Sequence, residues 1–433
     1  MTFRILTLGC KVNQYESEAL SEQLVEAGFA PAPENRPADL YVVNTCTVTG
    51  ESDRKSRQFI RRAASENPGA PVLVTGCLSQ RQSEEVSRIP GVRFVCGTRE
   101  KAKVVDFARS LADGSMQPGS PVIDVTPLTS APFEPMRIRH FDRTRAYIKI
   151  EDGCNHYCSY CAIPYARGPV RSKPREDVLA ELEGFAGQGC PEIVLTGIET
   201  GSYGKDLDGY SLPDLLKEAD RLPGMGRIRL GSLDPSVITE EFSKAISGLS
   251  HICPHFHLSM QSGSDAVLKA MRRNYTVAEA EAALDRLRRD MPGVLFTTDI
   301  ITGFPGETDE MFEETLSFVR RQRFLHIHVF PYSARKGTRA ASFPDPVPVE
   351  VRRQRARRLI EEQKRIKREL IESLLPCDAD VLFETYENGQ AYGHTANFIE
   401  VAVPSPVDRK GTFARVRLTS TDGEHALGTI QAT

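Results

Sequence analysis

The sequence lacks three features that would assign it to a broad class of protein. No apolar run approaches the roughly 20 residues that a membrane-spanning helix needs. Residues 1–6 lead directly into a strand-like pattern and show no signal-peptide layout. The net charge is only −3, so any basic surface for nucleic acid must be local. We therefore expect a cytoplasmic protein with no membrane partner.

The chain does contain enough residues for two or three domains and an unusual number of cysteines. Its 433 residues are 40% hydrophobic and 26% charged, which is typical of a globular protein with sizeable cores. Ten cysteines in a reducing compartment indicate metal ligands rather than disulfides. The positions of these cysteines therefore indicate where a metal site would lie.

Three cysteines, Cys154, Cys158 and Cys161, lie on one short loop with the spacing C-x₃-C-x₂-C. Three thiolates can hold one inorganic centre, whereas four would saturate it, so one coordination position stays open for a small molecule. The alternative is a structural zinc loop with a fourth ligand elsewhere, for example His156. Zinc loops usually use C-x₂-C pairs, so the spacing favours the open centre.

The N-terminal region alternates strand-like and helical segments, which predicts a parallel, doubly wound sheet. The expected strands are residues 3–8, 40–43, 72–75 and 92–95. Cys10, Cys46 and Cys77 each follow such a strand, and ligands of these sheets gather at the carboxyl ends of the strands. A shared metal site is the favoured interpretation, although small buried side chains are the alternative. Cys96 occupies a fourth equivalent position, and spacing alone does not exclude it.

Residues 113–139 have a linker composition, and six further strand-like runs separated by amphipathic helices follow them. These runs are residues 147–150, 193–196, 227–230, 255–259, 294–300 and 326–330. Six β/α units predict a partial parallel barrel, whose chemistry sits on the loops after its strands. Candidates there for the groups of a bound cofactor are Glu199, Ser232, Asp234, Gln261, Ser262 and the run 303–307.

The C-terminal part combines a basic helix with a small β-domain. Residues 352–368 carry many arginines and lysines, which suggests a phosphate-binding surface, although such charge runs are usually solvated helix faces. Five short alternating strands after Pro376 predict a small OB-like β-barrel. Its candidates for stacking on bases are Tyr386, Tyr392, His394 and Phe398, with core packing as the alternative for Phe398.

The cysteine loop, with Tyr160 just before its last cysteine, resembles that of the radical S-adenosylmethionine enzymes. The segments around Cys10, Cys46 and Cys77 are similar to the N-terminal domain of the methylthiotransferases in that superfamily. The resemblance implies two [4Fe-4S] clusters, the first held by Cys154, Cys158 and Cys161 and the auxiliary one by Cys10, Cys46 and Cys77. It implies S-adenosylmethionine contacts at Tyr160, Glu199, Ser232 and Gln261, although the family commonly has a different residue near Glu199. Cys96 has no matching role.

The same resemblance implies the domains and the reaction. We expect a methylthiotransferase N-terminal domain at residues 1–112, a linker at 113–139, a radical core at 140–370 and an RNA-binding TRAM-like domain at 371–433. Such an enzyme inserts sulfur into a C–H bond and methylates it, and it needs a reducing donor such as a flavodoxin or ferredoxin. Oligomeric state does not follow from the sequence.

The substrate is the remaining expectation from the resemblance. Residues 8–15 and 165–168 are most similar to the enzymes that act on N6-threonylcarbamoyladenosine beside the tRNA anticodon. Alternatives are N6-isopentenyladenosine in tRNA and an aspartate of a ribosomal protein. The threonyl carboxylate would call for an arginine, and Arg272, Arg273 and Arg335 are candidates. Rivals are a non-catalytic zinc protein that binds RNA and another radical enzyme, such as a thioether-forming one.

Overall fold

A computed structural model describes residues 1–116, 119–129, 132–141 and 143–431. The chain forms two compact units. The first comprises Met1–Ile138, Lys149–Pro174 and Ser333–Ala341, and the second comprises Arg139–Ile148, Arg175–Tyr332 and Ser342–Thr433. The cysteine loop at Cys154 thus belongs to the same unit as the N-terminal sheet. The domain limits drawn from the sequence stay predictions.

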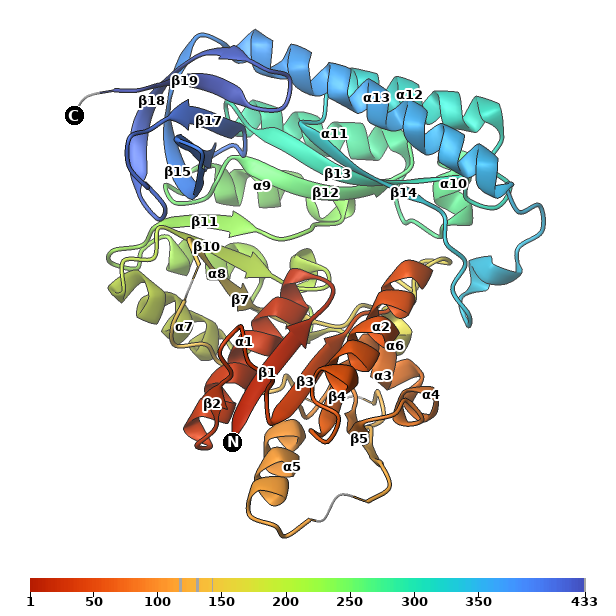
Figure 1. The fold of residues 1–433 in the computed structure, drawn as a ribbon. Helices are drawn as coiled ribbons and strands as arrows, with labels where there is room; N and C mark the ends of the chain where they lie inside the picture. The colour runs from red at the N-terminus through yellow and green to blue at the C-terminus, as the bar shows by residue number, and fades with distance from the viewer. Residues whose placement is uncertain (117–118, 130–131, 142, 432–433) are drawn as a thin grey trace. The chain divides into compact units, whose positions relative to one another are not determined.

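The first unit is built on a parallel sheet with the strand order β2-β1-β3-β4-β5-β6 (Figure 1). Its strands are β1 (Thr2–Thr7), β2 (Ala30–Pro31), β3 (Leu40–Thr45), β4 (Val72–Gly76), β5 (Val92–Cys96) and β6 (Val122–Asp124). β3 and β4 are buried along their whole length, which explains their continuous apolar sequence, since parallel strands are covered on both faces. The predicted doubly wound sheet is confirmed. The short β2 and β6 were not predicted, because two or three residues carry no readable periodicity.

Helices connect these strands and place the loops that matter for the site. They are α1 (Lys11–Glu26), α2 (Gly50–Glu66), α3 (Cys77–Arg81), α4 (Ser83–Ser87) and α5 (Ala102–Ala112). α1 packs against α5, whereas α2 packs on β3 and β4. The strand order reverses between β1 and β3, and ligands of doubly wound sheets bind at such a switch point. Cys10 and Cys46 follow these two strands.

The second unit contains the predicted partial barrel. Its strands are β7 (Arg145–Lys149), β10 (Glu192–Thr196), β11 (Arg227–Leu230), β12 (His255–Gln261), β13 (Leu295–Thr302) and β14 (His326–Pro331). They form two three-stranded sheets, in the orders β11-β10-β7 and β12-β13-β14. Two isolated parallel bridges connect these sheets, one between Ile228 and Ile252 and one between Leu233 and Leu258. This arrangement confirms the partial parallel barrel.

The helices between these strands match the amphipathic segments of the sequence. They are α7 (Arg175–Gly187), α8 (Leu212–Ala219), α9 (Glu240–Ser247), α10 (Asp265–Ala270), α11 (Val277–Asp290) and α12 (Asp309–Gln322). α10 and α11 are separate helices, and Thr276 and Glu279 form a capping box that starts α11.

A 26-residue helix, α13 (Val349–Leu374), leads from the barrel to the C-terminal domain (Figure 1). The strands β15 (Cys377–Glu387), β16 (Gln390–Thr395), β17 (Glu400–Pro404), β18 (Phe413–Thr421) and β19 (Ala426–Ile430) close into a small barrel. Its core, including Val381, Phe383 and Val416, packs against Leu370 and Ile371 of α13. The predicted OB-like barrel is confirmed. None of the helices in the described ranges is long and apolar enough to cross a membrane.

Candidate active site

Three cysteines converge at one edge of the first unit's sheet. Cys10 precedes α1, Cys46 follows β3, and Cys77 begins α3 directly after β4. All three are free thiols; Cys46 and Cys77 are buried. Burial, together with the nearby Cys46 and Cys10, raises the pKa of the Cys77 thiol to about 12, although Arg167 acts in the opposite direction. Three thiols that oppose one another's ionisation are a donor set that a bound cation would stabilise, and thiolates are the ligands of iron–sulfur clusters.

Gly9 and Asn13 fix the backbone of the loops that carry Cys10 and Cys46. Gly9 has φ +110°, and a Cβ there would lie 3.1 Å from the Cys46 Sγ, so the loop after β1 approaches Cys46 without room for a side chain. Asn13 Nδ2 donates to the carbonyl oxygens of Leu8 (2.7 Å) and Thr45 (3.0 Å). The asparagine therefore ties together the loops that carry Cys10 and Cys46.

The second cysteine set lies on the loop between β8 (Glu151–Asp152) and α6 (Pro164–Arg167). The Cys154 N–H donates to the Gly168 carbonyl (3.0 Å), and the Cys161 N–H donates to the Cys158 carbonyl (3.0 Å). A Cβ on Gly153 would overlap the Pro169 carbonyl, so only glycine fits before Cys154. The loop is thus closed on itself and carries three thiols outside any disulfide.

A buried ion-pair network connects the segments that carry the two cysteine sets. Arg167 on α6, which is fully buried, donates from Nη1 to Glu16 (2.7 Å) and to Asp152 (3.0 Å). Its Nη2 donates to Asn13 Oδ1 (2.6 Å). Lys149 binds Glu16 and Asp152, each at 2.8 Å. Glu16 lies on α1, which Cys10 precedes, and Asp152 lies two residues before Cys154, so one guanidinium group links both loops.

This network carries an excess of positive charge. Lys101 approaches Glu16 at 3.2 Å and Arg171 approaches Asp152 at 3.2 Å, which makes four cations around two carboxylates. Burial opposes ionisation of Glu16, but Arg167, Lys101 and Lys149 outweigh it and hold the pKa of that carboxyl far below its usual value. The charge of Arg167 also lowers the pKa values of Cys46 and Cys77, against the effect of burial. The surplus charge therefore favours thiolate at the sheet edge.

Arg81 on α3 interacts electrostatically with one cysteine of each set, Cys77 and Cys161. Burial lowers the pKa of its guanidinium group, whereas Cys161 and Cys77 both raise it. Neither this contact nor the network around Arg167 was predicted, although Glu16 and Arg167 lie within the segments that carry the family resemblance. The paired residues are up to 154 positions apart, as in the Arg167–Asn13 pair, and periodicity gives no signal for such pairs.

In the second unit, the loops after β10 and β11 bring together three of the predicted cofactor candidates. Glu199 Oε1 accepts hydrogen bonds from the backbone N–H groups of Asp234 (3.0 Å) and Gly201 (3.2 Å). The Ser232 carbonyl accepts from the Thr200 N–H (3.1 Å). Burial and the charge of Asp234 raise the pKa of Glu199 to about 7. A cationic group bound there would favour the charged carboxylate, as expected for an ammonium partner.

Gln261 lies at the end of the adjacent strand β12, is buried and has φ +65°. An ion pair between Asp234 and Arg273 (2.6 Å), with Arg273 also donating to the Ser259 carbonyl (2.9 Å), connects this strand end with that of β11. Tyr160, by contrast, belongs to the first unit and is half-buried. The roles of all four predicted contacts stay predictions.

The candidates for recognition of a threonyl carboxylate are largely occupied by other partners. Arg273 is committed to Asp234, and Arg335 is buried and paired with Asp53 at 2.6 Å and Thr47 at 2.8 Å. Arg272 is exposed with φ +59°. Nothing here assigns the carboxylate to any of the three.

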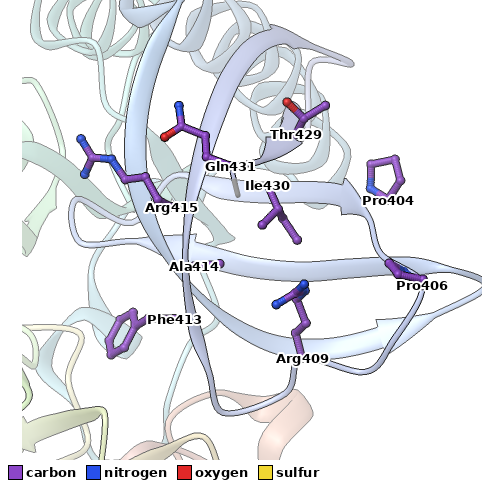
Figure 2. A pocket seen from close by; sticks show the side chains of 9 residues that line it. All are labelled: Pro404, Pro406, Arg409, Phe413, Ala414, Arg415, Thr429, Ile430 and Gln431. Atoms are coloured by element: carbon purple, nitrogen blue, oxygen red, sulfur yellow. The ribbon is translucent and has the colours of Figure 1, made fainter. Parts of the chain in front are cut away.

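Two shallow grooves on the C-terminal barrel differ in charge. One is lined by Tyr392 and His394 together with Glu384, Glu387 and Glu400, so it would repel phosphates. The other is lined by Arg409, Arg415 and the half-exposed Phe413, and Arg415 pairs with Asp380 (3.2 Å), which is not among the lining residues (Figure 2). Cations beside an exposed aromatic ring are typical of single-stranded nucleic-acid surfaces.

Of the two interpretations of Phe398, base stacking and core packing, the structure favours core packing. His255 and His394 stack on its ring with centroids 4.5 and 4.6 Å away, and the Arg229 guanidinium lies 4.7 Å from its centre. The ring is thus part of a packed cluster. Tyr392 makes an edge contact with His425 in the acidic groove.

The basic helix α13 also differs from the phosphate-binding surface that its composition suggests. Arg355 binds Glu307 (2.6 Å) and Asp309 (2.7 Å), Arg358 binds Glu313 (2.7 Å), and Arg365 binds Glu369 (2.5 Å) and Glu362. Lys367 pairs with Glu400 and Glu424. The acids that pair with Arg355, Arg358 and Lys367 come from other elements and could not be read from the helix alone, whereas those that pair with Arg365 lie on α13 itself.

Family models match both units. Residues 148–319 match the radical SAM superfamily, and residues 2–97 match the uncharacterized protein family UPF0004. The partial barrel and the three-cysteine loop thus define a radical S-adenosylmethionine enzyme.

Curated relatives extend over nearly the whole chain. Threonylcarbamoyladenosine tRNA methylthiotransferase MtaB of Bacillus subtilis is 40% identical over 95% of this chain and 92% of its own. The protein of the same name from Thermotoga maritima is 39% identical over 98% and 96%. The tRNA-2-methylthio-N(6)-dimethylallyladenosine synthase of Moorella thermoacetica is 34% identical over 96% of each chain. The chain belongs to the radical S-adenosylmethionine tRNA methylthiotransferase family.

The fold is also similar to that of a solved radical enzyme. The radical S-adenosylmethionine methyltransferase TsrM from Kitasatospora setae, with a [4Fe-4S] cluster and cobalamin bound, aligns with TM-score 0.56 over 78% of this chain and 77% of its own. Its sequence identity is 17%, so the likeness concerns the fold alone.

Proposed function

We propose that this protein inserts a methylthio group at carbon 2 of N6-threonylcarbamoyladenosine, next to the anticodon of tRNA. The observation that carries the proposal is the full-length similarity to relatives named for this activity, at 36–40% identity. The proposal implies a cytoplasmic site of action and a reducing electron donor of the flavodoxin or ferredoxin kind. A second candidate is the dimethylallyl form of the same adenosine, because relatives named for that product are 31–35% identical.

In this proposal Cys154, Cys158 and Cys161 hold the cluster that binds S-adenosylmethionine, and Cys10, Cys46 and Cys77 hold the auxiliary cluster. Both donor sets fit, because each supplies three thiols outside any disulfide from one loop or one sheet edge. When bound, these groups supply the electron, the radical, the sulfur and the methyl group. The chain itself fixes the two loops through Asn13 and Arg167 and holds a carboxyl, Glu199, for the ammonium group of the cofactor.

A nucleoside analysis of tRNA tests the reaction and the substrate together. Cells that lack this protein should lose the methylthio form and accumulate N6-threonylcarbamoyladenosine, measured by mass spectrometry of digested tRNA. Re-expression should restore the product. Accumulation of isopentenyladenosine without its methylthio group would replace the substrate with the second candidate, and unchanged tRNA would contradict the proposal and direct attention to the ribosomal protein.

The basic groove of the C-terminal barrel is the proposed tRNA surface. We expect Arg409→Ala to weaken tRNA binding and to reduce the slope of log Kd against log salt by about 0.7 to 0.9, the value for one lost phosphate contact. Arg415 is left unchanged, because it pairs with Asp380. Titrations of fluorescent tRNA at several salt concentrations measure this slope. Arg365→Ala is the control, because Glu362 and Glu369 neutralise that residue, and an equal loss in the control would rule out the groove.

A further inference from the structure

Two histidines and one aspartate lie together on the barrel strands, apart from the cysteine loops. Suitable ligand atoms of His257, Asp299 and His328 all lie within 4.8 Å of one another. His257 is on β12, Asp299 on β13 and His328 on β14, which are consecutive neighbours in the sheet. The described function gives these three side chains no role.

The strand register explains why the three side chains share one face. His257 pairs with Thr297 across β12 and β13, and Asp299 pairs directly with His328 across β13 and β14. Thr297 and Asp299 are two residues apart, so their side chains point to the same side of the sheet. Three ligands on paired parallel strands are held by the backbone ladder, which is a more rigid platform than a loop.

Neighbouring hydroxyl and ring groups orient one ligand. His257 Nε2 lies 3.1 Å from Asp299 Oδ2, while His257 Nδ1 lies 2.9 Å from Thr297 Oγ1. The same Thr297 hydroxyl lies 3.1 Å from His255 Nε2. Metal-binding histidines usually have the second ring nitrogen fixed in this way, which directs the first toward the ion.

We propose that His257, Asp299 and His328 form a binding site for one divalent transition-metal ion of the zinc or iron(II) class. Two imidazoles and one carboxylate are the ligand set of many such sites, and they leave coordination positions open. Bonds of about 2.0 to 2.2 Å would draw the three ligand atoms to within roughly 3.5 Å, a movement that the exposed His328 allows. The site is independent of the proposed substrate.

Zinc binding by the full chain, with both cysteine sets loaded with iron and sulfide, tests the site. Equilibrium dialysis against Zn²⁺ under anaerobic conditions, followed by elemental analysis of zinc and iron, should give one zinc per chain without loss of iron. His257→Ala and His328→Ala should each weaken zinc binding by more than about tenfold. Thr297→Val, which keeps the shape and removes the hydroxyl, should weaken it by about 10- to 100-fold.

His425→Ala is the matched control, because His425 forms a similar pair with Asp422 (3.2 Å) on the C-terminal barrel but has no part in the triad. Its zinc content should equal that of the unmodified protein. Absence of zinc from the iron-loaded protein, or equal zinc in all variants, would overturn the proposal. Circular dichroism verifies that His328→Ala is folded, so that its loss of zinc reports the lost ligand.

Discussion

Cys154→Ala should reduce cleavage of S-adenosylmethionine to the level of a protein-free control, whereas Cys10→Ala should keep the cleavage and lose the methylthio product. The reason is that the two cysteines belong to separate donor sets, one on the loop after β8 and one at the edge of the sheet. The measurement is 5′-deoxyadenosine and methylthio nucleoside by liquid chromatography and mass spectrometry, after reconstitution with iron and sulfide.

Cys377→Ala is the control for this comparison. Cys377 is half-buried at the start of β15 and has no place in either set, so both products should remain at the level of the unmodified protein. If Cys154→Ala and Cys10→Ala lose cleavage equally with full iron at the untouched set, the proposed division between the two sets is wrong.

Arg167→Met should destabilise the protein by about 3 to 5 kcal/mol, because it leaves Glu16 and Asp152 buried with fewer partners. Methionine has a similar length but no charge or donors. It also removes the hydrogen bond to Asn13, and with it the link between the two cysteine loops. Thermal unfolding should show a lower Tm, and iron content after reconstitution should fall at both sets.

An exposed ion pair in the same unit gives the matched control. Arg54 binds Glu51 at 2.5 Å with both side chains more than half exposed, so Arg54→Met should leave the Tm nearly unchanged. Arg167→Lys keeps the charge but lacks the forked donors of arginine, so its Tm should lie between those of Arg167→Met and Arg54→Met. If Arg167→Met unfolds at the same temperature as Arg54→Met, the network does not stabilise the unit as argued.

Much of the fold could be predicted because its signals are local. Continuous apolar runs gave β3 and β4, and alternating strand and helix gave both parallel sheets. The position of Cys10, Cys46 and Cys77 after three strands was sufficient to predict that they meet, since carboxyl ends of parallel strands share one edge. The spacing at Cys154 likewise identified the second set without any knowledge of tertiary structure.

The sequence left alternatives open where the surroundings of a residue decide its role. Core packing was the alternative to base stacking for Phe398, and His255 and His394 cover its ring. The cations of α13 suggested a phosphate surface, yet Glu313 pairs with Arg358 and Glu400 pairs with Lys367. His255, Glu313 and Glu400 are distant in sequence from the residues they contact, so the sequence gives no local signal for these pairs.

The sequence by itself determined the order of strands and helices, the two cysteine sets and the family, because these depend on short-range spacing and periodicity. Only the tertiary structure decided that Arg167 links Glu16 and Asp152, that Arg409 and Arg415 line one groove of the C-terminal barrel, and that His257, Asp299 and His328 meet. Such contacts depend on strand register and on burial, which lowers the local dielectric and makes charge pairing obligatory.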